Sequence, residues 1–399
     1  MQKSLDYFAN ETYFSRVKRY LYNQILEDLK KKVVFITGPR QVGKTYLAKQ
    51  IMVNFARPQY LNYDSLSDLR VIRDTSWSLN TDLIVFDEIH KMKNWKSYIK
   101  GVYDSKHVNQ SILVTGSARL DTFRQTGDSL AGRYLHLRLN PLSVKEISTI
   151  IPDPYEAMEL LNTFSGFPEP LLNGVNLEKE KAEIEAARWK NQYYSDLIKE
   201  DILEFSRISE IKTMKILLQL LRTKVGSPLS INSIANDLQV SPNTIKKYVQ
   251  ILEGLYIIFL VSPFHKNIAR SILKEPKVYF YDTSFIEGDE GVKLENTCAV
   301  SLLKHVQFLF DAKGENINLH YLRTKDNKEV DFAISRDGEL LQIIEVKLSD
   351  NRLSSSLKYF AERFKSVEAI QLVHNLKHNE SRDGIEILSA SDWLCGLSV

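Results

Sequence analysis

Residues Gly38 to Thr45 have the types and the spacing of a phosphate-binding loop. They read G-x-x-x-x-G-K-T and end in Gly43, Lys44 and Thr45. Glycine lets the backbone approach an anion closely, and the backbone N–H groups at a helix start attract negative charge. In such a loop the lysine reaches the terminal phosphates of a nucleotide, and the following hydroxyl ligates Mg²⁺. We therefore expect a site for ATP and Mg²⁺, built from Gly38, Pro39, Arg40, Gln41, Val42, Gly43, Lys44, Thr45 and Tyr46.

The segments on either side of this loop are those that would position it. Residues 33–37 are β-branched or aromatic, as expected of a buried parallel strand, and residues 46–53 have helical periodicity. This strand–loop–helix context favours a true phosphate loop over a chance glycine turn. Another helix is expected over residues 11–30, with Arg16, Lys18 and Arg19 away from its apolar side.

A second apolar strand, residues 81–88, ends in two carboxylates, Asp87 and Glu88. Asp87 would bind Mg²⁺ directly or through water, together with Thr45. Glu88 would position or deprotonate the water that attacks the terminal phosphate. Two adjacent acids also occur in solvated turns, but the phosphate loop upstream favours nucleotide hydrolysis.

Two further polar residues are candidates for the same reaction. Ser117 follows the apolar strand 111–116, at a strand end where α/β sheets bind ligands, and would sense the γ-phosphate. Arg133 precedes the strand 134–139 and would stabilise transition-state charge, either within one chain or in a neighbouring subunit. The alternative for Arg133 is an ion pair with Asp121 or Asp128.

Four sequence runs together carry a resemblance to a known family. They are GPRQVGKTYLAKQ, LIVFDEIHKMKNW, TGSARL and SLAGRYLHLRLNPLSVKEI. In this order they resemble the AAA-type ATPase domain of a prokaryotic family that joins it to a C-terminal domain of unknown function, DUF4143. The resemblance implies that Lys44, Thr45, Asp87, Glu88 and Ser117 fill the Walker A, Walker B and sensor roles.

Composition limits the remaining classes of protein. The chain has 399 residues, 43% hydrophobic and 26% charged, which is ordinary for a globular protein of two or three domains. A net charge of +3 gives no global attraction to nucleic acid, so any basic surface must be local. The two cysteines lack metal-type spacing and favour a reducing compartment. With no long apolar run and no signal-peptide pattern, we expect a cytoplasmic protein without a membrane contact.

Residues 229–262 predict a winged-helix pattern of helix, turn, helix and strand. Ser241 and Pro242 would begin the second helix as its cap and first residue. Residues at the start of a recognition helix contact bases or phosphates. The candidates for DNA contact are Asn243, Thr244, Lys246 and Lys247. The alternative is a module that docks on the ATPase domain or on another protein.

The last third of the sequence contains carboxylates in a nuclease-like pattern. Asp331 lies in one apolar strand, and Glu345 and Lys347 share one side of the next strand because side chains alternate. Glu295, Asp331, Glu345 and Lys347 resemble a PD-(D/E)xK nuclease core, in which the acids hold Mg²⁺ and the lysine activates water. The alternative is a structural salt-bridge cluster with no cleavage.

These patterns predict an α/β protein with a P-loop parallel sheet, a helical and winged-helix middle and a small restriction-endonuclease-like α/β end. We expect an ATPase that acts on DNA. The alternatives are a nucleotide switch for a protein partner and an ATP-gated, Mg²⁺-dependent nuclease; the sequence leaves oligomerisation open. The expected domains are 1–145 (ATPase), 146–225 (helical linker), 226–285 (winged helix) and 286–399 (nuclease-like).

Overall fold

The chain forms two compact units in a computed structural model, and each is described by itself. The N-terminal unit comprises residues 18–140 and 254–256, and the C-terminal unit holds residues 141–253 and 257–399. Residues 254–256 count with the N-terminal unit, where the hydroxyls of Tyr256 and Thr37 lie 3.1 Å apart. The structure describes residues 17–116, 130–198, 208–265, 274–349 and 352–399.

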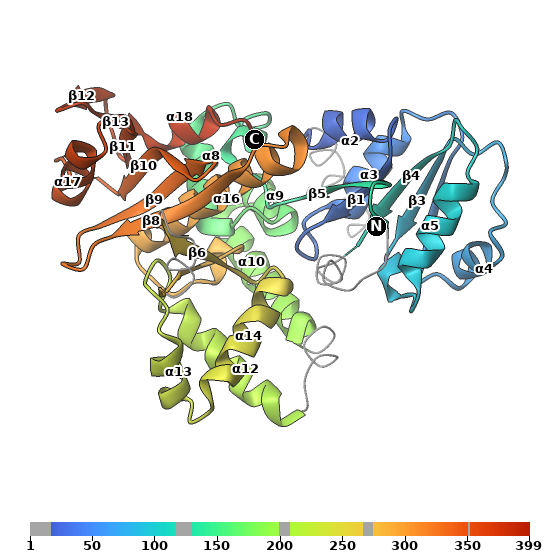
Figure 1. Ribbon diagram of the computed structural model, residues 1–399, viewed down its shortest axis with the longest axis horizontal. Helices are drawn as coiled ribbons and strands as arrows, with labels where there is room; N and C mark the ends of the chain where they lie inside the picture. Colours follow the sequence, from blue (N-terminus) through green and yellow to red (C-terminus); the bar gives the residue numbers. More distant parts are fainter. Residues whose placement is uncertain (1–16, 117–129, 199–207, 266–273, 350–351) are drawn as a thin grey trace. The chain divides into compact units, whose positions relative to one another are not determined.

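A parallel five-stranded sheet is the centre of the described N-terminal unit, with the strand order β2-β3-β4-β1-β5. Every residue of β1 and β3 is buried and most are β-branched or aromatic, as expected of buried parallel strands. The sheet and its helices are the blue and cyan elements of Figure 1. Their bounds are α2 Tyr22–Asp28, β1 Val33–Thr37, α3 Lys44–Met52, β2 Pro58–Asn62, α4 Leu66–Asp74, β3 Leu83–Asp87, η1 Ile89–Lys91, α5 Trp95–Ser105, β4 Ser111–Thr115 and β5 Tyr134–Arg138.

Alternating residues of these strands enter different hydrophobic layers. Phe35, Phe86 and Val114 pack with Trp95 and Ile99 of α5 in one core cluster. The intervening strand residues point to the other side, because side chains alternate along a strand. There α3 contacts β3 and β4. The unit is therefore a sheet between helical layers, with the loop after β1 at the carboxyl edge of the strands.

Proline residues begin several helices in the helical half of the C-terminal unit. α8 ends at Phe164 and α9 begins at Pro168, so residues 165–167 form the turn between these helices. α14 begins at Pro242, as predicted. The helices in this half are α7 Val144–Ile147, α8 Pro154–Phe164, α9 Pro168–Asn176, α10 Lys179–Asp196, α12 Ile208–Arg222, α13 Ile231–Asp237 and α14 Pro242–Gly254.

The rest of the described C-terminal unit is built on an eight-stranded mixed sheet with the strand order β12-β13-β11-β10-β9-β8-β6-β7. β6 pairs with β7 and also, at Ser262 and Pro263, with β8, so the strands after the helix–turn–helix segment belong to this same sheet. The elements are β6 Ile258–Pro263, β7 Lys277–Phe280, η4 Thr283–Phe285, α16 Glu290–Lys313, β8 Ile317–Arg323, β9 Glu329–Arg336, β10 Glu339–Lys347, α17 Ser355–Arg363, β11 Glu368–Val373, β12 Glu380–Arg382, β13 Ile385–Ser389 and α18 Ala390–Cys395.

The expected segments correspond only partly to these two units. The expected 1–145 segment ends five residues beyond the N-terminal unit at Asn140. The segments 146–225, 226–285 and 286–399 all lie in the C-terminal unit, apart from residues 254–256. The helix–turn–helix segment is thus continuous with the C-terminal sheet, because its strands β6 and β7 extend that sheet.

Candidate functional site

The phosphate loop adopts backbone conformations that only its glycines reach without strain. Gly38 and Gly43 have φ of 145° and 97°. A methyl group on Gly38 would lie 2.1 Å from the carbonyl oxygen of Leu139, so no other residue fits there. The Lys44 ammonium donates to the carbonyl oxygens of Gly38 (3.0 Å) and Pro39 (2.5 Å), which places it inside the loop.

The other predicted loop residues line the same turn at different depths. Val42 is buried, Gln41 is exposed with a φ of 57°, and Arg40 and Tyr46 are half-buried. Gly43 is the residue before α3, so the N–H groups of the first turn of α3 open toward the loop. This arrangement suits a polyphosphate.

A buried arginine that the sequence pattern placed on a helix surface braces this loop. Arg19 is only 2% exposed, and its guanidinium donates to the carbonyl oxygens of Val42 (2.7 Å) and Asn140 (2.5 Å). The expected helix over residues 11–30 is too long in its described part, because α2 runs only from Tyr22 to Asp28. Arg19 lies before α2 and joins the loop to the chain after β5.

Asp87 is the centre of a network of three hydroxyl groups. The Thr45 and Tyr60 hydroxyls donate to its Oδ2 atom at 2.7 and 2.6 Å, and the Thr115 hydroxyl donates to Oδ1 at 2.6 Å. Asp87 is 3% exposed, so these bonds compensate a carboxylate withdrawn from water. Burial, followed by the hydrogen bond to Asp87, raises the pKa of Tyr60, which keeps that hydroxyl a donor. Thr45 and Asp87 form a pair of oxygen donors that fits Mg²⁺.

The strand order explains why these four residues meet. β4 lies between β1 and β3, and Asp87 is directly opposite Thr115 in the parallel register. Thr115 is therefore placed between the phosphate loop and the acid. Sequence analysis missed Thr115 and Tyr60; a polar residue at the end of a strand was a usable signal for Thr115, whereas Tyr60 lies in the middle of β2.

Glu88 follows Asp87 in a strained backbone conformation, with a φ of 59°. Burial, and next the charge of Asp87, raises the pKa of the Glu88 carboxyl, whereas Lys44 and Lys91 act in the opposite direction. Its Oε2 atom lies 3.5 Å from His90 Nε2 and 3.8 Å from Lys91 Nζ. A carboxylate with a raised pKa beside the Mg²⁺ ligand suits a group that accepts a proton from water.

Of the two remaining candidates for the hydrolysis reaction, the structure describes only Arg133, which lies away from the phosphate loop. Ser117 lies outside the described residues. Arg133 precedes β5, and the parallel pairing of Val33 with Tyr134 puts it at the amino edge of the sheet. The loop begins after the five residues of β1, about 16 Å farther along the strands. Arg133 instead donates to Asp104 at 2.8 Å, so a role within the same chain does not fit. The alternative partners Asp121 and Asp128 lie outside the described residues.

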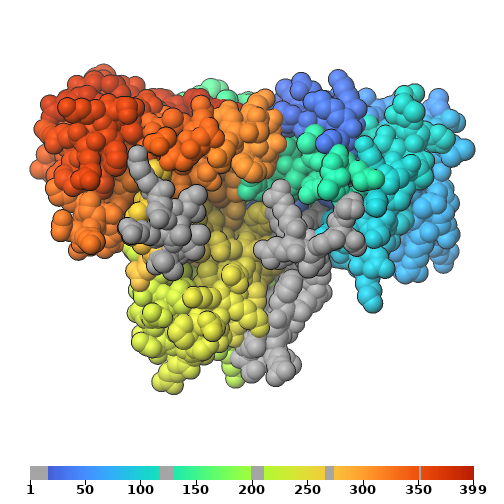
Figure 2. All heavy atoms as spheres, viewed as in Figure 1, coloured from blue at the N-terminus to red at the C-terminus, as the bar shows by residue number. Residues whose placement is uncertain are grey.

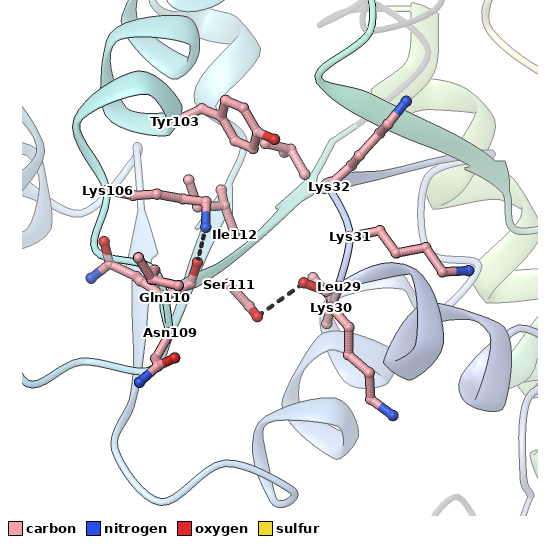
Figure 3. Close-up of a pocket in the computed structure, with 12 residues that line it drawn as sticks. Leu29, Lys30, Lys31, Lys32, Tyr103, Lys106, Asn109, Gln110, Ser111 and Ile112 are labelled. Carbon is pink, nitrogen blue, oxygen red and sulfur yellow. Dashed lines mark hydrogen bonds between the residues drawn. The ribbon is translucent and has the colours of Figure 1, made fainter.

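A basic pocket of about 260 Å³ lies at this amino edge, near the start of β1 and β4. Figure 3 shows Lys106 turned toward the carbonyl oxygen of Gln110, at 2.8 Å, while Lys30, Lys31 and Lys32 extend in different directions. The pocket is distinct from the phosphate loop, and its ammonium groups do not converge on one point. It is not part of the nucleotide site.

The predicted recognition helix is α14. The Ser241 hydroxyl accepts the Thr244 N–H at 3.1 Å, which caps the helix, and lies 2.9 Å from the Thr244 hydroxyl. Asn243, Lys246 and Lys247 are exposed, whereas Thr244 is half-buried. The yellow atoms of this region form part of the surface in Figure 2. Three of the four predicted contact residues are therefore on the surface.

The four nuclease-like candidates of the C-terminal unit do meet, but around a lysine that sequence analysis missed. Lys277 of β7 is 1% exposed, and its ammonium lies 2.8 Å from Glu329, 3.5 Å from Glu295 and 3.6 Å from Asp331. Burial acts to lower the pKa of Lys277, but these carboxylates outweigh it and raise that pKa. The only sequence signal was a lysine at the start of an apolar strand.

Glu345 and Lys347 form the outer part of the same cluster. They pair at 2.7 Å, and the Asp331 carboxylate accepts the backbone N–H of Val346 at 2.9 Å. Burial, followed by the charge of Asp331, raises the pKa of both Glu295 and Glu345 to about 7. Among the described residues, no three His, Cys, Asp or Glu side chains are arranged to hold a metal ion. The geometry is that of a charge cluster.

The N-terminal geometry defines a class of protein: a P-loop nucleotide-binding domain with an acid at the end of β3. Family comparisons then specify the chain. Residues 30–148 match an AAA domain, residues 157–288 a domain of unknown function (DUF8612), and residues 290–393 a domain of unknown function (DUF4143). The AAA and DUF4143 models thus match this chain in the predicted order, which confirms the predicted arrangement.

Relatives are similar over most of this chain. An uncharacterized protein of Methanocaldococcus jannaschii is 28% identical over 400 residues, covering 90% of this chain and 85% of the relative. One from Haemophilus influenzae is 22% identical over 402 residues, covering 90% and 93%. Among solved structures, the Walker-type ATPase of Pyrococcus abyssi is 15% identical, with a TM-score of 0.46 over 68% of this chain and 94% of that one.

None of the described helices is both long and apolar enough to cross a bilayer.

Proposed function

We propose that this chain hydrolyses ATP at the phosphate loop and uses the hydrolysis to act on DNA bound by α14. The observation that supports hydrolysis is the Asp87 network, in which three hydroxyl groups fix the carboxylate beside Thr45. A site that only bound phosphates would not need an acid so firmly oriented, followed by Glu88.

The roles of the residues follow from their positions. The loop N–H groups and Lys44 hold the phosphates, and Thr45 and Asp87 would hold Mg²⁺, which neutralises phosphate charge when bound. Glu88 orients the attacking water and accepts its proton, because it is the acid next to Asp87 with a raised pKa. The burial of Asp87 and Lys44 excludes competing water from their charges.

The DNA part of the proposal is supported by the exposed start of α14. Lys246 and Lys247 provide positive charge and Asn243 an amide that reads base edges. Two lysines neutralise about two phosphates, so binding should be weak and should fall only about tenfold between about 50 and 200 mM salt.

The test is steady-state ATP hydrolysis with and without single- and double-stranded DNA. Lys44→Ala should abolish hydrolysis. DNA should stimulate the wild type, and Lys246→Ala/Lys247→Ala should lose this stimulation while keeping the basal rate. Lys179→Ala/Lys181→Ala, which removes the same charge from exposed positions on α10, should behave like the wild type.

The outcomes separate the alternatives. Hydrolysis that neither form of DNA changes would refute the DNA part and support a nucleotide-dependent switch acting on a protein partner. Hydrolysis that survives Lys44→Ala would refute the assignment of the site itself. DNA cleavage that requires Mg²⁺ and disappears in Asp331→Asn would support the ATP-gated nuclease instead.

A further inference from the structure

The carboxylates around Lys277 already have partners within the protein. Lys277 contacts Glu295, Glu329 and Asp331, which come from α16 and β9, at distances of 2.8 to 3.6 Å. Each of these acids has a second donor as well. The second donors are the Tyr279 hydroxyl to Glu295 (2.7 Å), the Arg323 guanidinium to Glu329 (3.0 Å) and the backbone N–H of Val346 to Asp331 (2.9 Å).

The exposure of these groups shows which charge the cluster is built around. The side chains of Glu295, Glu329 and Asp331 are 19–26% exposed, whereas that of Lys277 is 1% exposed. An ammonium at that depth is stable only while its carboxylates remain in place. Tyr321 adds an aromatic ring 5.5 Å from the ammonium, which further favours the positive charge.

We propose that the Lys277 ammonium takes the place of a divalent cation among these carboxylates, so that the cluster is a metal-free relative of a metal site. A cation and an ammonium would repel each other within 4 Å of the same oxygens. The wild-type cluster therefore excludes Mg²⁺ and Mn²⁺. The three acids are not arranged to hold a metal ion while Lys277 lies among them, but removing the ammonium frees carboxylate oxygens, the donor atoms that hard divalent cations prefer.

One carboxylate oxygen of the cluster has no partner of this kind among the described residues. Glu345 Oε2 is buried and accepts no hydrogen bond from the part of the chain that the structure describes. Its other oxygen pairs with Lys347, at 2.7 Å, so a second ammonium is already at this carboxylate. The experiment must therefore test Glu345 separately from the acids that contact Lys277.

The experiment is a Mn²⁺ titration of the full chain, followed by electron paramagnetic resonance without nucleotide. Asp87→Asn is present in every sample, so that the nucleotide site does not contribute. The protein that keeps Lys277 should bind no more Mn²⁺ than the same protein with Asp331→Asn or Glu345→Gln added. Lys277→Met should gain one Mn²⁺ site, and Asp331→Asn should abolish the gain. The proposal would be overturned if the protein that keeps Lys277 binds Mn²⁺ and Asp331→Asn or Glu345→Gln removes that binding.

The matched control is Lys347→Met, the same substitution at the other lysine of the cluster. Its side chain is 37% exposed and contacts only Glu345 within the cluster's ion pairs, so it should gain no Mn²⁺ site. A gain equal to that of Lys277→Met would show that total charge decides, and would contradict the proposal. If Lys277→Met unfolds, added Mn²⁺ should restore its thermal transition; failure to restore it would count against a cation substituting for the ammonium.

Discussion

Thr115→Val tests whether the hydroxyl network around Asp87 supports catalysis. The substitution preserves the shape of a side chain that is 0% exposed and removes one 2.6 Å hydrogen bond to a carboxylate. Such a bond contributes about 1.5–3 kcal/mol, which corresponds to about a 10- to 150-fold change in an equilibrium or rate. Two other hydroxyls still hold Asp87, so the lower half of this range is expected. Partners behind a metal ligand have similar effects, about 10- to 100-fold.

The assay is ATP hydrolysis over a series of Mg²⁺ concentrations, with urea unfolding as the measure of stability. Thr115→Val should hydrolyse ATP about tenfold more slowly and need more Mg²⁺. Thr297→Val is the control, because it removes a buried threonine hydroxyl in the C-terminal unit, 3.3 Å from Thr283. It should leave hydrolysis unchanged. A folded Thr115→Val with the wild-type rate and Mg²⁺ dependence would refute the role of this network.

Three further predictions concern charged groups. Glu88→Gln should bind nucleotide but hydrolyse it at least about 100-fold more slowly, because the amide cannot accept the proton of water. The pKa of Glu88 is raised, so wild-type hydrolysis should fall on acidification at a higher pH than an ordinary glutamate would give. Arg133→Ala removes an exposed ion pair with Asp104, so the urea midpoint should hardly move. Hydrolysis by dilute protein should not change. A loss of hydrolysis that grows with protein concentration would reveal that Arg133 acts between subunits. The pKa values of Glu295 and Glu345 are raised to about 7, so the folded state binds protons more tightly than the unfolded state, and urea stability should be higher at about pH 5.5 than at about pH 7.5. Glu295→Gln/Glu345→Gln should flatten that difference, and an unchanged slope would contradict it.

The parts of the site that depend on adjacent residues could be predicted from the sequence. The phosphate loop is a continuous motif, and Asp87 ends a continuous apolar strand, so neither depends on how distant segments pair. Thr115 and Tyr60 contact Asp87 only because β4 and β2 are its neighbours in the sheet, and strand order is not encoded in any one segment. The distance of Arg133 from the loop could have been inferred, since it precedes a strand parallel to β1.

Buried charges were the least predictable feature. Arg19 and Lys277 look like ordinary surface residues in sequence, because periodicity treats every charged side chain as solvated. Each is buried since it has specific oxygen partners: the carbonyl groups of Val42 and Asn140 for Arg19, and the carboxylates of α16 and β9 for Lys277. These partners are distant in the chain, so only the folded arrangement reveals them.

The sheet shared by β6, β7 and β8 bears on how this chain could have evolved. The two C-terminal family matches meet between residues 288 and 290, yet that boundary separates β6 from its partner β8 and Lys277 from Glu295. A gene fragment ending there would encode an open sheet edge and a buried ammonium without its counter-ions, both of which favour aggregation. Recombination at this point would thus be selected against, and the two segments should be inherited as a pair.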